Sequence, residues 1–279
     1  MKKWMSLSLV GVLVLGLVTF AAGCGKSANQ AGEQKEFRVG LECGYAPFNW
    51  TQADNSNGAV PIEGTNAFAG GYDVEIAKKI AEGLGRKLVI VKTVWDGLPP
   101  AVQSGSIDAI IAGMSPTADR KKTLDFSDAY YRSQLVIVVK KGSAFEKATS
   151  IQDFKGARIT AQLNTFHYSV IDQIQGVAKQ TAMDDFPAMR VAVQSGIIDG
   201  YVSERPEGVS ASAANKDFVM VEFAQGKGFT ASDDDVAIAV GLKKGNADRE
   251  QINKILSAIS EEQRTTIMDQ AIKNQPAAK

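Results

Sequence analysis

Ala101–Ile111 reads AVQSGSIDAII, and Ala192–Val202 reads AVQSGIIDGYV. The two stretches share seven of the eight positions of the phrase A-V-Q-S-G-x-I-D, and their starting points lie 91 residues apart. In each copy the residues before the glycine are typical of a helix end. The glycine supplies the left-handed conformation found just past such an end, and the residues after it favour a strand. Two copies of one helix–glycine–strand unit predict two similar α/β lobes.

Polar and charged residues follow both copies. Ser115 and Arg120 come after the first strand, and Glu204 comes after the second. A strand of an α/β unit delivers the residues behind it to the carboxyl edge of its sheet, where such folds hold ligands. One lobe therefore offers a cation and the other an anion, so a zwitterion held between the lobes would meet both.

Strand and helix patterns alternate along the rest of the chain, which predicts an α/β fold with largely parallel sheets. The expected strands are Phe37–Leu41, Leu88–Val94, Ile107–Ile111, Tyr131–Lys140, Ala157–Ala161, Asp199–Val202, Phe218–Phe223 and Val236–Leu242. The expected helices are Tyr72–Leu84, one capped by Asp96 and running through Leu98 and Val102, Thr117–Lys122, Phe166–Ile174, Pro187–Ser195 and Arg249–Asp269. Ser150 and Asp153 have the spacing of a helix-capping pair, and the polar insert Gln52–Asn66 is expected to be a surface loop.

The N-terminus has the pattern of a secretory signal. Lys2 and Lys3 precede an apolar run from Leu7 to Phe20, which is shorter than the roughly 20 residues that a membrane-spanning helix needs. Ala-Ala-Gly-Cys24 follows and resembles the bacterial lipobox, which implies cleavage after residue 23 and lipid attachment to Cys24. Residues 1–23 are thus expected to be a lipoprotein signal peptide and 24–36 a flexible tether.

Length and composition further limit the possible number of lobes and the possible kinds of ligand and cofactor. About 240 residues follow Glu36, enough for two lobes. Without Lys2 and Lys3 the 31 basic residues become 29, against 31 acidic ones, so no basic excess for nucleic acid is expected. An acylated Cys24 would leave Cys43 as a lone thiol, expected to be a small buried residue at a strand end. No cluster has the spacing of a metal site, and no cofactor is expected.

Several short phrases then carry a family resemblance. They are Tyr45-Ala-Pro-Phe48, Phe68-Ala-Gly-Gly-Tyr-Asp-Val-Glu75, Trp95-Asp-Gly-Leu98, Gly105-Ser-Ile-Asp-Ala-Ile-Ile111, Met114-Ser-Pro-Thr-Ala-Asp-Arg120 and Phe126-Ser-Asp-Ala-Tyr130. In this order they resemble the polar-amino-acid-binding proteins that feed ABC importers, close to those that bind lysine, arginine, ornithine and histidine. The resemblance covers residues 37–275. It implies a two-lobed periplasmic-binding-protein-like fold with a two-strand hinge, with lobe I at 37–131 and 225–279 and lobe II at 132–224.

The resemblance also implies a ligand site. Arg120 matches the arginine that grips the α-carboxylate, for which a guanidinium is suited because its planar fork binds carboxylate bidentately; the competing interpretation is an ion pair with Asp119 or Asp125. Ser115 is expected to assist Arg120. Thr165 would reach the carboxylate from lobe II near a helix N-terminus, although it could also be a plain helix cap. Three neighbours of Thr165 are expected to support binding of the carboxylate. They are Gln162, Asn164, which stands where the family usually has glycine, and Phe166, whose backbone N–H could donate to the carboxylate.

The resemblance also assigns residues to the ligand's α-ammonium and to its aliphatic stem. Glu204 matches an aspartate that receives the α-ammonium and is one methylene longer. Trp95 and Tyr45 match aromatics that sandwich the ligand's aliphatic stem, with core packing as the alternative for Tyr45. Ala112 and Gly113 match positions that contact the ligand mainly through backbone.

Glu42 is expected to determine which amino-acid side chains the site accepts. It follows the first strand and matches an acidic position that meets the distal group in the binders of cationic amino acids. A carboxylate there would pair with guanidinium or ammonium and repel glutamate or aspartate, unless it is simply a solvated strand-end residue. Cation–π attraction from Tyr45, Trp50 and Trp95 could add to the same preference.

The expected function is therefore capture of an amino acid, arginine or lysine in the first place, by a monomeric protein outside the cell membrane. Its expected partners are an ABC permease and its ATPase, together with the membrane through Cys24. The alternatives are a secreted dehydratase-like enzyme or an amino-acid sensor on the same fold. Against an enzyme, the sequence shows no nucleophile–base pair, and the single histidine, His167, is expected on a helix surface.

Overall fold

The computed structural model describes residues 35–276. The predicted signal peptide, Cys24 and nearly all of the predicted tether lie outside the described residues. In the part of the chain that is described, no helix is both long and apolar enough to cross a membrane.

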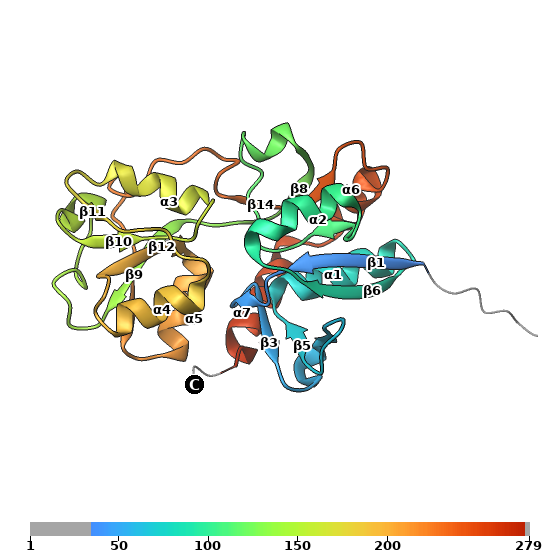
Figure 1. The fold of residues 1–279 in the computed structure, drawn as a ribbon, viewed down its shortest axis with the longest axis horizontal. Helices are drawn as coiled ribbons and strands as arrows, with labels where there is room; N and C mark the ends of the chain where they lie inside the picture. The colour runs from blue at the N-terminus through green and yellow to red at the C-terminus, as the bar shows by residue number, and fades with distance from the viewer. Residues whose placement is uncertain (1–34, 277–279) are drawn as a thin grey trace, which may run out of the picture. The chain divides into compact units, whose positions relative to one another are not determined.

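Two five-stranded sheets with the same topology organise the chain (Figure 1). The first has the order β6 (Lys87–Lys92), β1 (Glu36–Leu41), β7 (Ala109–Ile110), β14 (Ala237–Lys243) and β8 (Leu124–Arg132). The second has the order β11 (Ala178–Lys179), β10 (Arg158–Thr160), β12 (Gly200–Glu204), β9 (Leu135–Lys140) and β13 (Phe218–Val221). In each sheet the first three strands pair in parallel and the last two join antiparallel. The predicted α/β class is confirmed, and each sheet is mixed rather than largely parallel.

Helices cover both sheets. Those associated with the first sheet are α1 (Tyr72–Gly83), α2 (Leu98–Ser104) and α6 (Arg249–Ser257). Those associated with the second are α3 (Phe166–Val170), α4 (Phe186–Gln194) and α5 (Arg205–Ala214). Helix α7 (Glu261–Asn274) packs against α1 and against α5. A small third sheet contains β2 (Gly44–Tyr45), β3 (Asn49–Gln52), β5 (Phe68–Gly70) and β4 (Val60–Pro61). It brings Tyr45 and Phe48 into an apolar core cluster that contains residues of both five-stranded sheets, and both side chains are buried there.

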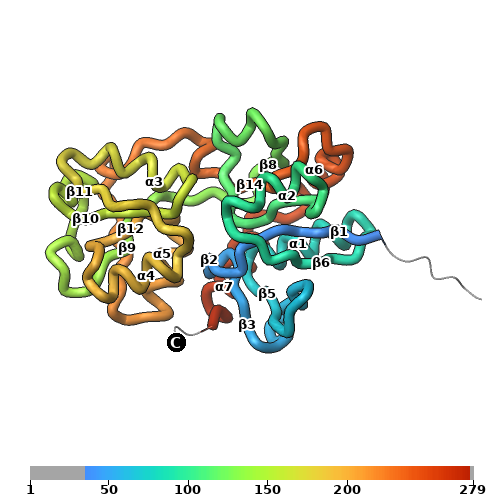
Figure 2. The backbone as a smooth tube through the Cα atoms, viewed as in Figure 1, coloured from blue at the N-terminus to red at the C-terminus, as the bar shows by residue number. Residues whose placement is uncertain are grey.

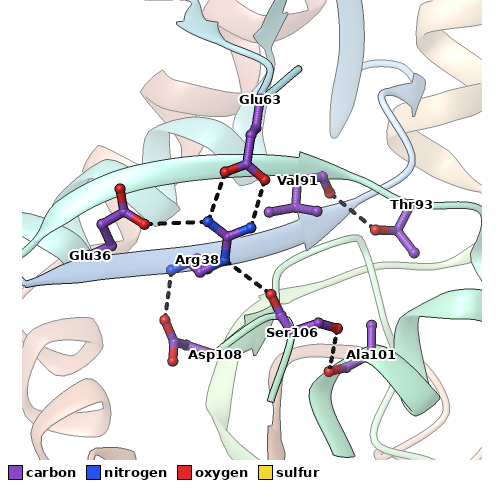
Figure 3. A network of polar contacts seen from close by, with 8 residues as sticks. All are labelled: Glu36, Arg38, Glu63, Val91, Thr93, Ala101, Ser106 and Asp108. Atoms are coloured by element: carbon purple, nitrogen blue, oxygen red, sulfur yellow. Dashed lines mark hydrogen bonds and ion pairs between the residues drawn. The ribbon is translucent and has the colours of Figure 1, made fainter. Parts of the chain in front are cut away.

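The repeated phrase has a shared structural role that involves its aspartate. In the first copy, Asp108 accepts a hydrogen bond from the backbone N–H of Arg38 on β1 (2.8 Å), and the Arg38 side chain donates to the Ser106 carbonyl (Figure 3). In the second copy, Asp199 accepts from the backbone N–H of Arg158 on β10 (2.8 Å). The Arg158 side chain also donates to the carbonyl of the residue two before Asp199. Each aspartate therefore ties its helix–glycine–strand unit to the neighbouring strand.

The two glycines of the repeat adopt the predicted left-handed conformation, with φ of 81° at Gly105 and 74° at Gly196. Both follow the last turn of a helix, where a residue with a Cβ would be strained at such a φ. The sequence repeat thus reflects a real repeat of structure.

One predicted strand proves to be two. The apolar run Tyr131–Lys140 is divided between β8 and β9, which belong to different sheets, so the prediction of a single strand is wrong. Ser133 and Gln134 lie between the two strands and carry the chain from the first sheet to the second, and residues 222–236 bring it back to β14 (Figure 2). Phe223 and Phe229 of this return segment pack on the apolar core of the second sheet.

One predicted helix is also divided. Arg249–Asp269 was expected to be continuous, but α6 ends at Ser257 and α7 begins at Glu261. The cause is Ser260, whose hydroxyl accepts from the backbone N–H of Gln263 while the Gln263 side chain accepts from the backbone of Ser260. This reciprocal capping box starts a new helix.

Smaller differences concern helix ends. Asp96 does not cap the following helix; it lies inside a short 3₁₀ turn, Trp95–Gly97. The helix predicted at Thr117–Lys122 is reduced to a 3₁₀ turn at Arg120–Lys122. The insert Gln52–Asn66 is not entirely a loop, because it contains β4. Ser150 and Asp153 form the predicted capping box.

Candidate ligand-binding site

The predicted site residues follow the carboxyl ends of strands in both sheets. Glu42 follows β1, Ser115 comes after β7, and Glu204 is the last residue of β12. Gln162 and Thr165 follow β10. Hydrogen bonds join the two groups, because Gln162 bonds Glu42 and Tyr45 bonds Glu204. The expected placement of these side chains after the carboxyl ends of strands thus holds in both sheets.

Arg120 is a half-buried cation whose side chain donates hydrogen bonds only to carbonyl groups. Its Nη1 donates to the Ser115 carbonyl at 3.0 Å and its Nη2 to the Asn164 carbonyl at 3.1 Å. The guanidinium also lies 4.9 Å from the centre of the Trp95 ring, a cation–π distance. Burial lowers the pKa of Arg120 to about 10, which leaves it charged at neutral pH.

The competing interpretation of Arg120 as a surface ion-pair partner does not hold. Asp119 pairs with Lys122 at 2.7 Å, and Asp125 pairs with Lys244 at 3.0 Å. Among residues 35–276, no carboxylate pairs with Arg120. A desolvated guanidinium without a counter-ion favours an incoming anion.

Glu204 is the acidic counterpart from the second sheet. It is 3% exposed, and the Tyr45 hydroxyl donates to its Oε2. Its Oε1 lies 3.0 Å from Nε2 of His167. Burial raises the pKa of Glu204 to about 8, and the nearby Glu207 charge adds to the shift. A carboxylate in this setting gains from an incoming cation.

His167 was expected on a helix surface, and this expectation is wrong. The side chain is buried at 8% exposure on α3, with its ring beside Glu204. No sequence pattern indicated this, because α3 is a single short helix and the direction in which its side chains point depends on how it packs. Burial lowers the pKa of His167 to about 3, and the Arg120 charge contributes.

Glu42 is joined to the second sheet by Gln162. The Gln162 Nε2 donates to Glu42 Oε1 at 2.8 Å and to the Asp184 carbonyl at 2.9 Å. Glu42 Oε2 is buried and has no hydrogen-bond partner within the described part of the chain. Because this oxygen is buried, Glu42 is not the solvated strand-end residue of the alternative interpretation. A buried carboxylate oxygen without a donor also costs free energy, which an incoming donor would recover.

Acidic groups surround Glu42. Burial raises its pKa to about 8, and the charges of Asp185, Asp96 and Asp73 act in the same direction. A cavity of about 280 Å³ beside Trp95 is lined by two of the nearby acidic residues, Asp96 and Asp184, together with Val94 and Leu163. This end of the site therefore favours a cation.

The Tyr45 ring packs against aromatic side chains of the protein. Its centroid lies 4.9 Å from that of Phe48 and 4.2 Å from that of Phe186, both in stacked geometry. The core-packing interpretation thus describes its ring, while its hydroxyl reaches Glu204. Ala112 and Gly113 are buried beside it. A Cβ on Gly113, where φ is 64°, would lie 2.7 Å from Tyr45 Cε1, so glycine leaves room for that ring.

Other predicted residues have different roles. The Thr165 hydroxyl donates to the Gln162 carbonyl at 2.6 Å and makes no side-chain cap bond. The half-buried Phe166 opens α3, which has only five residues, so the expected helix N-terminus amounts to one turn. Asn164 is left-handed as expected, with φ of 54°. Trp50 donates to Gln52 and lines a separate cavity of about 200 Å³, so these contacts do not place it in the site.

These residues can hold a molecule with one anionic and two cationic groups. Arg120 can receive the anion, Glu204 one cation, and Glu42 the other. Charged side chains from both five-stranded sheets meet in this site. Two similar sheets that share one such site are the architecture of a two-lobed binding protein. Residues 37–273 match the bacterial extracellular solute-binding proteins, family 3, and the chain belongs to this family.

Individual relatives agree with the family. The arginine-binding extracellular protein ArtP of Bacillus subtilis is 34% identical over 167 residues, which are 59% of this chain and 57% of that protein. Across three such curated relatives the match spans 51% to 63% of their length.

Solved structures are similar over more of the chain. An L-arginine-bound substrate-binding protein of an amino acid ABC transporter from Streptococcus pneumoniae has a TM-score of 0.75 and 26% identity, over 85% of this chain and 94% of that one. An ancestral arginine-binding protein bound to arginine has a TM-score of 0.69 and 30% identity, over 85% and 98%. The two-lobed α/β fold is thereby confirmed.

Proposed function

We propose that this protein captures a cationic amino acid, arginine in the first place, between lobe I (37–131 and 225–279) and lobe II (132–224). The observation that carries the proposal is the buried Oε2 of Glu42, which has no hydrogen-bond partner among residues 35–276 and lies in acidic surroundings. A guanidinium supplies the N–H donors that this oxygen lacks, together with the positive charge that the aspartates favour. Glutamate or aspartate would bring a further negative charge to the same place.

The backbone end of the ligand fits the remaining charges. An α-carboxylate on Arg120 would replace carbonyl acceptors with an ionised one, which makes stronger hydrogen bonds. An α-ammonium on Glu204 would supply the cation that this buried carboxyl lacks. The arginine-bound state of two similar solved structures supports the same ligand, although lysine has a distal cation as well.

Ligand capture is proposed to couple the lobes. Arg120 and Glu42 belong to the first sheet's side of the site, whereas Glu204 and Gln162 belong to the second. A ligand that bonds both sides has a higher affinity for the closed arrangement, which is the condition for a population shift. The two connections between the sheets are the proposed hinges, near Arg132 and Ala224.

The wider role follows from the family and remains part of the proposal. The loaded protein would deliver its ligand to an ABC permease driven by an ATPase. Lipid attachment at Cys24 would hold the protein on the outer face of the cell membrane.

Calorimetric titration at pH 6, 7 and 8 tests the ligand class. Glu42 and Glu204 each have a pKa raised to about 8, so both carboxyls carry protons at pH 6. A bound cation favours the ionised carboxylates, so protons compete with arginine. Arginine affinity should therefore rise by up to about tenfold per pH unit for each proton released, and it should level off above about pH 8.

Glutamate in the same titrations is the control and should show no binding comparable with arginine. Tighter binding of glutamate than of arginine would exclude the cationic preference. An arginine affinity that falls between pH 6 and pH 8 would contradict the roles of the two carboxyls.

A further inference from the structure

His167 is the single histidine of the chain, and the structure places it against the acidic residue of lobe II. Its Nε2 lies 3.0 Å from Glu204 Oε1, and both side chains are buried. The other oxygen of Glu204 accepts from the Tyr45 hydroxyl. Two side chains from different elements therefore hold the carboxyl from its two ends.

The position of the histidine proton follows from the surroundings of the ring. Nδ1 is buried and finds no hydrogen-bond partner within residues 35–276. A proton on Nδ1 would create a buried N–H donor with nothing to bond, which costs more than an unpaired weak acceptor. The neutral ring is therefore expected to carry its proton on Nε2, which lies 3.0 Å from Glu204 Oε1, a distance at which this N–H can donate to that oxygen.

The surrounding charges keep the ring neutral. Arg120, the one cation that shifts the pKa of His167, lowers it together with burial to about 3. Glu204 itself faces Tyr45 from β2 and Glu207 from α5. His167 is thus a neutral donor across the range in which amino acids are zwitterions.

We propose that His167 is a positioning residue for ligand capture: its Nε2–H fixes the Glu204 carboxylate in the orientation that receives the ligand's α-ammonium. The inference rests on the proposed function, because it assigns Glu204 to that ammonium. Glutamate has three side-chain torsions, and a carboxyl held at both oxygens loses little further freedom when the ligand arrives. The alternative is that His167 has only a packing role in lobe II and does not affect the orientation of Glu204.

Paired variants and paired ligands separate these roles. His167→Leu keeps the bulk and removes the donor, whereas His167→Gln keeps an amide N–H at a similar reach. L-Arginine has the α-ammonium, and 5-guanidinopentanoate is the same molecule without it. His167→Leu should weaken arginine about tenfold or more and leave 5-guanidinopentanoate within about twofold of wild type. His167→Gln should restore most of the arginine affinity.

Equal losses for both ligands in His167→Leu, or no loss for either, would overturn the positioning role. Thermal unfolding of each unliganded variant shows whether the fold is kept. Failure of the wild-type protein to bind arginine at all would instead overturn the proposed function, so the two failures are distinguishable.

A second measurement needs no substitution. Because the chain has one histidine, the ¹⁵N NMR signals of its imidazole can be assigned directly in the full-length protein. The expected spectrum at about pH 9, where Glu204 with its pKa of about 8 is largely ionised, is that of a neutral ring protonated on Nε2, and the Nε2–H signal should shift more on addition of arginine than of 5-guanidinopentanoate. A ring protonated on Nδ1, or a charged imidazolium, would overturn the inference even if His167→Leu fails to fold.

Discussion

Replacement of Arg120 by alanine should weaken every amino-acid ligand, cationic or neutral. The side chain is half-buried, makes hydrogen bonds only to carbonyls and has no carboxylate partner in the described chain. An α-carboxylate bound there would lose its buried counter-ion in the variant. Loss of one partner of such a pair costs about 2–5 kcal/mol, which corresponds to about 30-fold to 4,000-fold in affinity. Isothermal titration with arginine and with glutamine measures the loss.

Lys122→Ala is the matched control for this substitution. It removes a positive charge from the same 3₁₀ turn, but Lys122 is 73% exposed and pairs with Asp119 at the surface. Exposed pairs contribute little, so the control should bind almost as wild type does. A similar loss in both variants would show a general effect of charge rather than a carboxylate contact at Arg120.

Replacement of Glu42 by glutamine should act on selectivity. A hydrogen bond to a charged group contributes about 1.5–3 kcal/mol, so arginine should bind about 10-fold to 100-fold more weakly. A neutral ligand such as glutamine should be largely spared, because it brings no charge to this end of the site. The Gln162 hydrogen bond can persist, since an amide carbonyl also accepts. Competition titrations of arginine against glutamine give the ratio directly.

Glu36→Gln is the control, because it makes the same change at the other end of β1, where Glu36 pairs with Arg38 at the surface (Figure 3). Its arginine-to-glutamine preference should match that of the wild type. Equal losses of arginine and glutamine affinity in Glu42→Gln would remove Glu42 from the selectivity role.

The sequence predicted the fold class and the charged ends of the site for one physical reason. Strands of α/β units end at a common edge, so Glu42, Ser115 and Glu204 could be placed there from their positions after apolar runs. The repeated phrase predicted two equivalent units, and the bonds of Asp108 and Asp199 confirm that equivalence.

The sequence could not predict features that depend on packing. The direction in which the His167 side chain points depends on how the one-turn helix α3 packs on the second sheet. The stacking of Tyr45 on Phe186 joins β2 to α4, which lie far apart in the sequence. The division of Tyr131–Lys140 was missed because two polar residues in an apolar run do not interrupt strand periodicity. Asp184 and Asp185 follow an irregular segment, so no pattern indicated that they would lie near Glu42.

A crystal structure of the protein with L-arginine tests the central claim most directly. The guanidinium should lie within hydrogen-bond distance of Glu42, the α-carboxylate should be bound by Arg120, and the α-ammonium should contact Glu204. The Arg120 bond to the Asn164 carbonyl should give way to that carboxylate. An arginine bound with its guanidinium on Glu204 and its carboxylate away from Arg120, or bound outside these residues, would contradict the account.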